Sequence, residues 1–513
     1  MPAAPIGRRT FLLGAGAATL AACSGGPPES DRMPDVVRTA HGPVRGQRRA
    51  TGIAFLGIPF ARPPIGDLRF AAPAPPEPWT DTLDCTRYGP TAQRKQLSTV
   101  TTIPEPSIPG DAVLNLNVFT PDPASEAKLP VLVWIHGGGF VAGSPASPWY
   151  DGAAFNRDGV VLVSVGYRLG IEGFLHLADA PDNRAVLDWI AALRWVRDNI
   201  AGFGGDPDKV TVAGQSAGGG AVWALLAAPS ARDLFRAGIC VSGAVTQPND
   251  RATAAATAES FTRITGLPAT AAALRELPGD RLQQLQDTLS PPGPGSANPS
   301  ILQLAPCADG TVIPEPTPAL LASGATADVP LLIGFTRHEF NMAAAAQHIS
   351  EAEAPAALAA MGVDTASLDS YRAAYPGLGA SELLGQIMSD MIIRGPSYRV
   401  AEDHARRGRP TWLYEFAWTS TAPDYRGMAA HCLDLPFAFD LLHAPGVTAA
   451  EGEAPPQSLA DAMHAAWVSF VRDGDPGRGW PRYTLDTRET MIWAEQPRVT
   501  ADPFAAQRAA WLR

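Results

Sequence analysis

The sequence predicts an α/β fold in which helices flank a mostly parallel central sheet. Short apolar, β-branched runs bounded by glycine or proline recur along the chain, as is typical of strands buried on both faces. Between two of them, residues 185–203 (AVLDWIAALRWVRDNIAGF) place apolar residues at helical spacing with charges on the other face. Strands that alternate with helices in this way favour a doubly wound sheet. The expected strands are 131–135, 160–167, 210–214, 237–243 and 329–336.

The remaining long segments are expected to surround this sheet. Residues 250–288 and 350–408 are rich in helix-forming residues and should be insertions or caps. Residues 290–300 (SPPGPGSANPS) predict a loop. No repeat period is visible. Large α/β enzymes can run this long as one unit, and residues 35–513 are expected to form a single domain.

The composition and charge argue against nucleic acid as a partner. Hydrophobic residues make up 46% of the 513 residues and charged residues 18%, which is ample material for a large core. The formal net charge is −11 and no long basic run is present, whereas a protein that binds nucleic acid would carry a basic patch. The sequence therefore predicts a globular protein with an acidic surface and no nucleic-acid partner.

Residues 1–22 have the layout of an export signal. The pair Arg8–Arg9 precedes a short apolar run, as in bacterial twin-arginine signals. The run ends in Leu-Ala-Ala-Cys, which resembles a lipoprotein box with Cys23 as the lipid-modified first residue of the mature chain. Residues 23–34 should form a flexible tether. We expect an exported protein attached to a membrane of the cell envelope through Cys23; the alternatives are a secreted protein with an ordinary cleaved signal, or a buried Ala-rich helix.

The other cysteines do not indicate a metal site. Cys85, Cys240, Cys307 and Cys432 are spaced too irregularly for metal binding or a dense disulfide framework. We expect mostly unpaired, partly buried thiols. The sequence leaves open any disulfide among them, and the oligomeric state.

One serine lies between glycines in residues 209–222, KVTVAGQSAGGGAV. Gly-x-Ser-x-Gly alone is weak evidence, because chance matches are common in a glycine-rich chain. Here a strand candidate precedes Ser216 and a small-residue helix candidate follows it, which is the context of a nucleophile elbow. Such a tight turn needs neighbours without bulk, and the helix N-terminus behind it offers amides to a developing oxyanion. The alternative is a spectator serine in a glycine-rich loop.

A second glycine motif follows an earlier strand, at WIHGGGFVAG (134–143). Consecutive glycines let backbone amides turn inward, as one half of an oxyanion hole requires. A phosphate-binding loop is the competing interpretation, but neither Gly-Lys-Ser/Thr nor Gly-x-Gly-x-x-Gly occurs here. The two motifs in this order favour a serine hydrolase.

A series of ordered motifs extends this pattern along the chain. They are FLGIPFARPPIGDLRFAAP (55–73), LNLNVFTP (114–121), VLVWIHGGGF (131–140), YRLGIEGFL (167–175), AALRWVRDNIAGFGGDPDKVTVAGQSAGG (191–219), IGFTRHE (333–339), HCLDLPFAF (431–439) and WVSFVRDGDPGRGWPRY (467–483). From about residue 36 the chain thereby resembles the type-B carboxylesterases, the cholinesterase-like branch of the α/β-hydrolase fold. The resemblance implies an α/β-hydrolase fold with large helical insertions, and a hydrolase of small-molecule carboxylic esters that needs no metal or cofactor.

The family uses a Ser–Glu–His triad, which the resemblance places on Ser216, Glu339 and His431. This is the nucleophile–acid–base order of the fold. Asp309 and Asp434 are alternative acids. The other histidines that could follow an acid are His348, His404, His443 and His464.

The resemblance also implies the roles around the triad. His431 would take the proton of Ser216 as its hydroxyl attacks an ester carbonyl, and Glu339 would orient the imidazole. The amides of Gly138, Gly139 and Ala217 would form the oxyanion hole. His136, which leads into the glycine loop, is expected to be structural.

The chain departs from the family pattern at several positions. It has His338-Glu339-Phe340 where the family usually has Asp-Glu-Gly, which leaves the local turn in doubt. Relatives often carry glutamate immediately before the nucleophile, whereas this chain has Gln215, so the site should attract cationic esters less.

Three further departures concern the surroundings of the site. Residues 95–113 hold no tryptophan, which argues against choline esters. The family's N-terminal disulfide lacks both partners, and Arg69 is expected to pair with Asp111 in place of the usual acid. Ser242 matches a buried family serine near the triad, for which a core hydrogen bond and a catalytic role are both open.

Two further functions compete with ester hydrolysis at this stage. One is a non-catalytic adhesion or binding member of the same fold. The other is a different acyl specificity, because the pocket walls should come from the variable stretches 95–110, 280–305 and 345–395. The triad and oxyanion residues are all competent, so we expect an enzyme.

Overall fold

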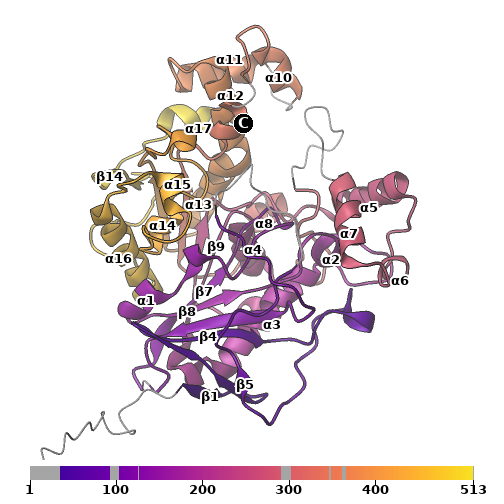
Figure 1. The fold of residues 1–513 in the computed structure, drawn as a ribbon. Helices are drawn as coiled ribbons and strands as arrows, with labels where there is room; N and C mark the ends of the chain where they lie inside the picture. Colours follow the sequence, from indigo (N-terminus) through magenta and orange to yellow (C-terminus); the bar gives the residue numbers. More distant parts are fainter. Residues whose placement is uncertain are drawn as a thin grey trace, which may run out of the picture.

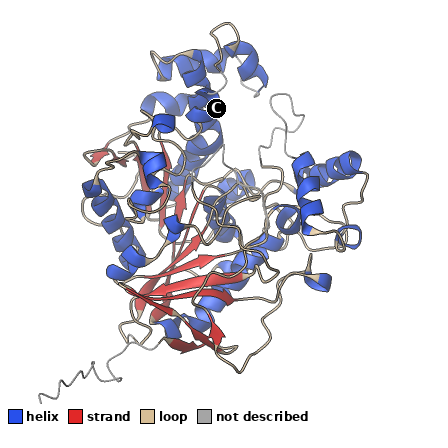
Figure 2. Ribbon diagram, in the orientation of Figure 1, coloured by secondary structure: helices blue, strands red, loops and turns tan. Residues whose placement is uncertain are grey.

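The computed structural model describes residues 35–92, 103–124, 126–289, 302–345, 348–360 and 365–511. An eleven-stranded sheet runs through the middle of the protein, with helices packed around it (Figures 1 and 2). The expected signal and tether, residues 1–34, and the expected loop 290–300 lie outside the described residues. Among the residues that the structure describes, no helix has both the length and the hydropathy needed to cross a membrane.

The strand order of the large sheet is β14-β13-β12-β11-β10-β9-β7-β8-β6-β4-β3. The strands from β13 to β8 in this order are parallel, whereas the strands at the two edges pair antiparallel. Every strand expected from an apolar run lies in the parallel part. The bounds are β3 Gln47–Arg49, β4 Gly52–Pro59, β6 Asn115–Thr120, β7 Leu129–Ile135, β8 Val161–Val165, β9 Gly205–Gln215, β10 Ala237–Val241, β11 Leu331–Thr336, β12 Thr411–Phe416, β13 Thr490–Trp493 and β14 Arg498–Thr500. A smaller sheet joins β1 Val36–Arg38, β2 Pro43–Arg45 and β5 Leu83–Asp84.

Alternate residues of β7 pack into two different cores. Val131 and Val133 share one cluster with side chains of α3 (Arg184–Asn199) and α4 (Ala217–Ala227). Leu132 and Trp134 share a second cluster with side chains of α16 (Gln457–Asp473). Successive side chains of a strand point to opposite faces, so a strand covered on both sides must be apolar throughout. This explains why continuous apolar runs identified β7, β8, β9, β10 and β11, although β12 and β13 of the parallel part were not predicted.

The helix-rich stretches form the expected insertions. The first contains α5 (Arg251–Thr265), α6 (Ala271–Leu274) and α7 (Gly279–Leu289), at the right of Figure 1. The second contains α10 (Ala354–Ala360), α11 (Thr365–Ala374), α12 (Ala380–Ser389) and α13 (Gly395–Arg406), with α10 to α12 at the top of Figure 1. A π-helical turn, Asp390–Arg394, joins α12 to α13. The remaining helices are α1 Ala153–Arg157, α2 Gly170–Phe174, α8 Thr317–Ser323, α9 Asn341–Ala345, α14 Leu435–Ala438, α15 Val447–Glu451 and α17 Ala505–Trp511.

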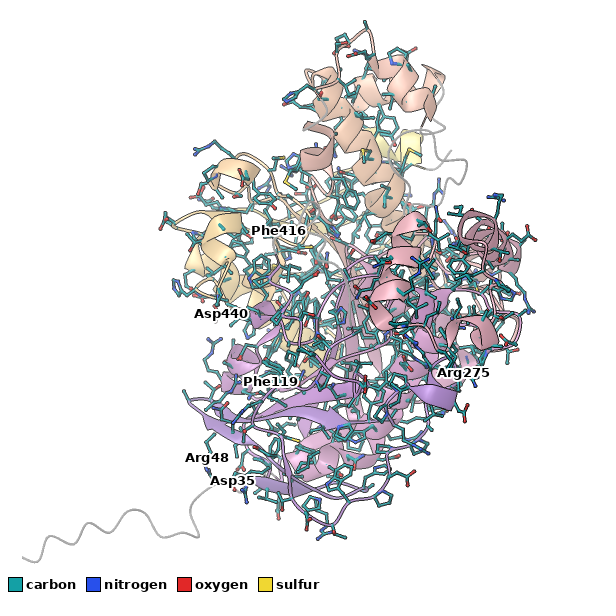
Figure 3. The ribbon with its side chains drawn as sticks, turned by 45° about the vertical axis from the view of Figure 1, so that its right-hand side comes forward. Asp35, Arg48, Phe119, Arg275, Phe416 and Asp440 are labelled. Carbon is teal, nitrogen blue, oxygen red and sulfur yellow. The ribbon has the colours of Figure 1, made fainter. Side chains whose placement is uncertain are left out.

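Both halves of the sheet contribute buried side chains. Figure 3 labels one from each half, Phe119 of β6 and Phe416 of β12, and both are buried. The four cysteines within the described ranges are free, as expected, and they are buried rather than only partly buried. Burial raises the pKa of Cys85, Cys240 and Cys307 to about 12, so these thiols stay protonated at neutral pH.

Candidate active site

Ser216 occupies the sharp turn between β9 and α4. Its backbone angles are φ 58° and ψ −120°, a sparsely populated region that costs a non-glycine residue about 1–3 kcal/mol. The amide of Ser216 donates to the carbonyl oxygen of Val241 at 2.9 Å, and its carbonyl oxygen accepts from the amides of Gly220 at 2.9 Å and Ala244 at 3.0 Å. Ser216 is partly exposed, whereas its two neighbours in sequence are buried. The turn thus has the strained geometry and the accessible serine of a nucleophile elbow.

Gly218, in the first turn of α4, shows why this elbow needs small residues. A Cβ at Gly218 would lie 2.0 Å from the carbonyl oxygen of Ile135, the last residue of β7. The helix therefore begins directly against the neighbouring strand. Ala217 is the first residue of α4, and amides in the first turn of a helix have no partner within the helix. The amide of Ala217 is thus placed at the carboxyl end of the sheet, next to Ser216.

The glycine loop after β7 lies beside the elbow, because β7 and β9 are neighbours in the sheet. A Cβ at Gly137 would lie 3.0 Å from the Cβ of Ser216. Gly138 and Gly139 have φ angles of 113° and 60°, which glycine adopts without steric cost. A Cβ at Gly138 would also lie 2.2 Å from the carbonyl oxygen of Ala142. The loop can fold back on itself next to Ser216 only because these positions lack side chains.

His136 holds the start of the glycine loop. Its Nδ1 lies 2.8 Å from the carbonyl oxygen of Gly137, and its ring stacks on that of Tyr167 at a centroid distance of 4.5 Å. The Tyr167 hydroxyl donates to the carbonyl oxygen of His136 at 2.9 Å. These contacts agree with the structural role expected for His136.

Glu339 and His431 form a buried pair at the same end of the sheet. Oε2 of Glu339 and Nδ1 of His431 are 2.5 Å apart, and the two residues are only 3% and 5% exposed. The other carboxylate oxygen accepts from the Ser242 hydroxyl and from the amide of Thr336, each at 2.7 Å. The carboxylate is therefore fixed against the imidazole. Of the two roles left open for Ser242, the hydrogen bond inside the core is the one that the structure shows.

The side chain of Gln215 reaches the other nitrogen of the imidazole. Gln215 Nε2 lies 3.0 Å from His431 Nε2, and Gln215 is fully buried at the end of β9. When Nδ1 of a neutral imidazole donates to Glu339, Nε2 is an acceptor and the amide of Gln215 donates to it. Because Ser216 follows Gln215, this contact holds the outer imidazole nitrogen beside the elbow. The sequence did not indicate this contact; the available signal was a polar residue directly after the mostly apolar run 210–214 (VTVAG).

The surroundings raise the pKa of His431. Burial by itself would lower this pKa, but the Cys432 sulfur and the Glu339 carboxylate outweigh burial and raise it well above the ordinary value. The charged imidazolium is therefore stabilised in this position. A side chain that accepts a proton during a reaction gains from such stabilisation.

The alternative acids have other partners. Oδ1 of Asp309 accepts from the amides of the turn that follows it, at residues 311–313. Asp434 is buried and accepts from the Tyr414 hydroxyl at 2.8 Å. Burial and the Glu339 carboxylate raise the pKa of Asp434 to about 7, so it is a poor source of negative charge.

The other candidate histidines do not join this pair. His404 Nδ1 lies 2.8 Å from Thr411 Oγ1, and His464 contacts the carbonyl oxygen of Ala438 and the carboxylate of Asp158. His348 and His443 are exposed. Within the described ranges, no three His, Cys, Asp or Glu side chains are grouped as metal ligands would be.

The expected partner of Arg69 is wrong. Its Nε lies 2.8 Å from Oε1 of Glu172 rather than pairing with Asp111, and its Nη1 donates to the carbonyl oxygen of Arg275 at 2.7 Å. Glu172 is far from Arg69 in sequence and reaches it only through the fold. No spacing rule could have indicated this pair.

Proteins of known family are similar to almost the whole chain. Residues 33–511 match the sequence model described as "Carboxylesterase family". The chain belongs to the carboxylesterase family. The para-nitrobenzyl esterase of Bacillus subtilis (strain 168) is 36% identical over 493 residues, which cover 92% of this chain and 97% of that protein. Carboxylesterase 1C of Rattus norvegicus is 33% identical over 512 residues, covering 91% of this chain and 90% of that protein.

Solved structures give the same result for the fold of this carboxylesterase. A PNB esterase structure is 35% identical, with a TM-score of 0.80 and coverage of 93% of this chain and 99% of that chain. The predicted α/β-hydrolase fold and the predicted type-B carboxylesterase family are both confirmed. The protein is an enzyme that hydrolyses carboxylic esters.

Proposed function

We propose that this carboxylesterase cleaves its substrate through an acyl-serine intermediate, with Ser216 as nucleophile, His431 as general base and Glu339 as the group that orients the imidazole. The observation that supports this best is the 2.5 Å contact between Glu339 and His431, on a ring whose other nitrogen faces the residue next to Ser216. The strained backbone of Ser216 is a second support.

Acylation begins when Nε2 of His431 exchanges its hydrogen bond from Gln215 for one from the Ser216 hydroxyl. Oγ of Ser216 then attacks the ester carbonyl carbon and Nε2 takes the hydroxyl proton. Glu339 keeps the other imidazole proton on Nδ1 and stabilises the imidazolium. The imidazolium then donates its proton to the alkoxy oxygen as the carbon–oxygen bond breaks. The alcohol leaves, and the acyl group remains on Ser216.

Negative charge on the carbonyl oxygen is stabilised by backbone amides. The amides of Gly138 and Gly139 come from the glycine loop, and the amide of Ala217 comes from the start of α4. Losing one donor of this kind typically costs about 10²–10³ in kcat. In deacylation, His431 takes a proton from water, the resulting hydroxide attacks the acyl carbon, and the acid is released as Ser216 regains its proton.

The substrate is proposed to be a neutral small-molecule ester. The chain lacks a tryptophan in residues 95–113, and a neutral amide at Gln215 replaces the glutamate common in relatives. Both features favour uncharged over cationic alcohols. The name of the Bacillus relative makes a para-nitrobenzyl ester a suitable first substrate.

Substitution of the nucleophile tests the proposal. We expect Ser216→Ala to abolish hydrolysis of short 4-nitrophenyl esters while the thermal unfolding midpoint stays close to that of the wild type. Ser242→Ala is the matched control, because Ser242 acts through Glu339 and its loss should leave measurable turnover. Undiminished hydrolysis by Ser216→Ala would refute the mechanism. A wild-type protein that neither hydrolyses esters nor reacts with a fluorophosphonate would favour the non-catalytic binding function instead.

We further propose that the mature protein is exported and held at a membrane of the cell envelope by lipid on Cys23. The support is the arginine pair, the short apolar run and the Leu-Ala-Ala-Cys sequence of residues 1–23. A secreted form cleaved without lipidation is the alternative outcome.

A further inference from the structure

The turn that carries the acid differs from the family pattern, and the residues on both sides of Glu339 contact the segment that carries His431. Where relatives usually have Asp-Glu-Gly, this chain has His338-Glu339-Phe340. We infer that His338 is a positioning residue, whose imidazole fastens the acid turn to the histidine segment and thereby holds Glu339 against His431. This role rests on the function proposed above.

Three hydrogen bonds tie the two segments together. The amide of His338 donates to the carbonyl oxygen of Ala429 at 2.9 Å, and the amide of His431 donates to the carbonyl oxygen of Glu339 at 3.3 Å. The amide of Ala429 donates to Nδ1 of the His338 ring at 3.0 Å. His338 and Ala430 also form a parallel bridge. The imidazole of His338 thus serves as the acceptor for a buried amide at the point where the two segments meet.

Loss of this hydrogen bond should affect catalysis because of where it lies. His338 directly precedes Glu339, and Ala429 lies two residues before His431. The hydrogen bond therefore joins the two segments within two residues of each catalytic side chain. The Phe340 ring lies on the other side of Glu339 in sequence and packs on the His431 ring at a centroid distance of 5.1 Å. Without the acceptor, the Ala429 amide would stay buried and unpaired, which is unfavourable. The segments would then shift, and the Glu339–His431 contact would lengthen.

The charges around His338 keep its ring an acceptor. Nδ1 can accept only while it carries no proton. Burial lowers the pKa of His338 to about 4, with further lowering by Arg394 of the π-helical turn and Arg337 of the acid turn. Glu415 of β12 acts in the opposite direction but does not reverse the shift. The ring therefore stays neutral, and the hydrogen bond persists, throughout the pH range in which the esterase would work.

Two substitutions separate the hydrogen bond from the bulk of the side chain. His338→Asn places an oxygen close to the position of Nδ1 and keeps the acceptor. His338→Leu has similar volume and removes it. We expect His338→Leu to lower kcat for a 4-nitrophenyl ester by at least about 10-fold with KM changed by less than about 2-fold, and His338→Asn to stay within about 3-fold of the wild type.

The pH profile distinguishes positioning from general destabilisation. Glu339 raises the pKa of His431, so a looser contact should lower that pKa. The acid limb of kcat/KM should therefore move to lower pH in His338→Leu and stay unchanged in His338→Asn. A wild-type kcat and acid limb in His338→Leu would overturn the role of His338, and so would equal losses in both variants.

If the proposed function is wrong, the wild-type protein itself will not hydrolyse the ester. That result is seen before any His338 variant is compared. Hydrogen exchange at the Ala429 amide then tests the contact alone. Faster exchange in His338→Leu than in His338→Asn would support the role, and equal exchange in all three proteins would contradict it.

Discussion

At the scale of single residues, the site depends on what each nitrogen of the His431 ring contacts. Nδ1 meets a carboxylate that is itself held by Ser242 and by the amide of Thr336. Nε2 meets the neutral amide of Gln215. The ring is thus fixed on both sides, and of its two partners only Glu339 carries a formal charge. The protonation of His431 is therefore the property through which single substitutions should act.

The pH dependence of the wild-type enzyme follows from the raised pKa of His431. The imidazole must be neutral to accept the Ser216 proton, and a raised pKa means that it becomes protonated at a higher pH than ordinary histidine. We expect kcat/KM for a neutral ester to fall as pH falls through a value above about 6.5. An acid limb well below that value, measured with a substrate that does not titrate, would contradict the raised pKa.

Replacing Gln215 by glutamate should change both pH dependence and selectivity. A carboxylate at this position would lie next to His431 Nε2 and raise the pKa of the imidazole further. Gln215→Glu should therefore shift the acid limb of kcat/KM upward, lower activity towards neutral esters at pH 7, and improve the ratio of cationic to neutral esters. Gln215→Met, which has no charge, is the matched control for the acid-limb shift. An unchanged selectivity ratio in Gln215→Glu would refute the effect of charge.

At the scale of elements, the elbow is built where a strand and a helix meet with almost no space between them. Gly218, the second residue of α4, lies against the end of β7, whereas Gly279, the first residue of α7, has no atom within 4 Å of its Cβ position. The two glycines are therefore a matched pair for testing how tightly the elbow is packed.

We expect Gly218→Ala to destabilise the protein and Gly279→Ala to be nearly neutral. Forcing a methyl group into a filled site typically costs about 1–3 kcal/mol, whereas substitutions at open surface positions usually stay within about 0.5 kcal/mol. Thermal unfolding monitored by circular dichroism would compare the two variants. Equal midpoints for both would mean that the elbow tolerates bulk, against the packing described above.

The sequence predicted most of the strands that helices cover on both faces. Central strands such as residues 131–135 are apolar at every position because helices cover both faces. The outermost strands, β3 (QRR) and β14 (RVT), have three residues each, are at least partly exposed and carry no such signal. The elbow and glycine loop were visible because close backbone packing requires particular residues. The contacts of Gln215, His338 and Arg69 were not visible, because each joins segments far apart in sequence.

At the scale of the whole molecule, the chain combines an acidic α/β-hydrolase body with an N-terminal sequence that we propose to be an export signal. The formal charge of −11 and the absence of a long basic run indicate that electrostatic attraction to an anionic lipid surface is weak. The proposal of membrane attachment rests on the N-terminal sequence.

Substitution of Cys23 tests this proposal. We expect the wild-type protein, expressed in a bacterium that processes lipoproteins, to sediment with membranes and to carry lipid on Cys23. Cys23→Ser should release esterase activity into the soluble fraction of the exported protein, with unchanged kcat. Cys85→Ser, at a buried cysteine within the fold, is the control and should stay with the membranes. A soluble wild-type protein would support the secreted alternative.

If Ser216 forms the covalent intermediate, a trapped adduct should lie on this residue, and mass spectrometry of the digested enzyme would locate it. The wild-type enzyme would be treated with a fluorophosphonate, digested, and searched for the added mass on every serine-containing peptide. We predict a single adduct on Ser216 that competing substrate suppresses and that His431→Ala strongly slows. An adduct on Ser242 or another serine, or no adduct in an enzyme that hydrolyses esters, would contradict the mechanism.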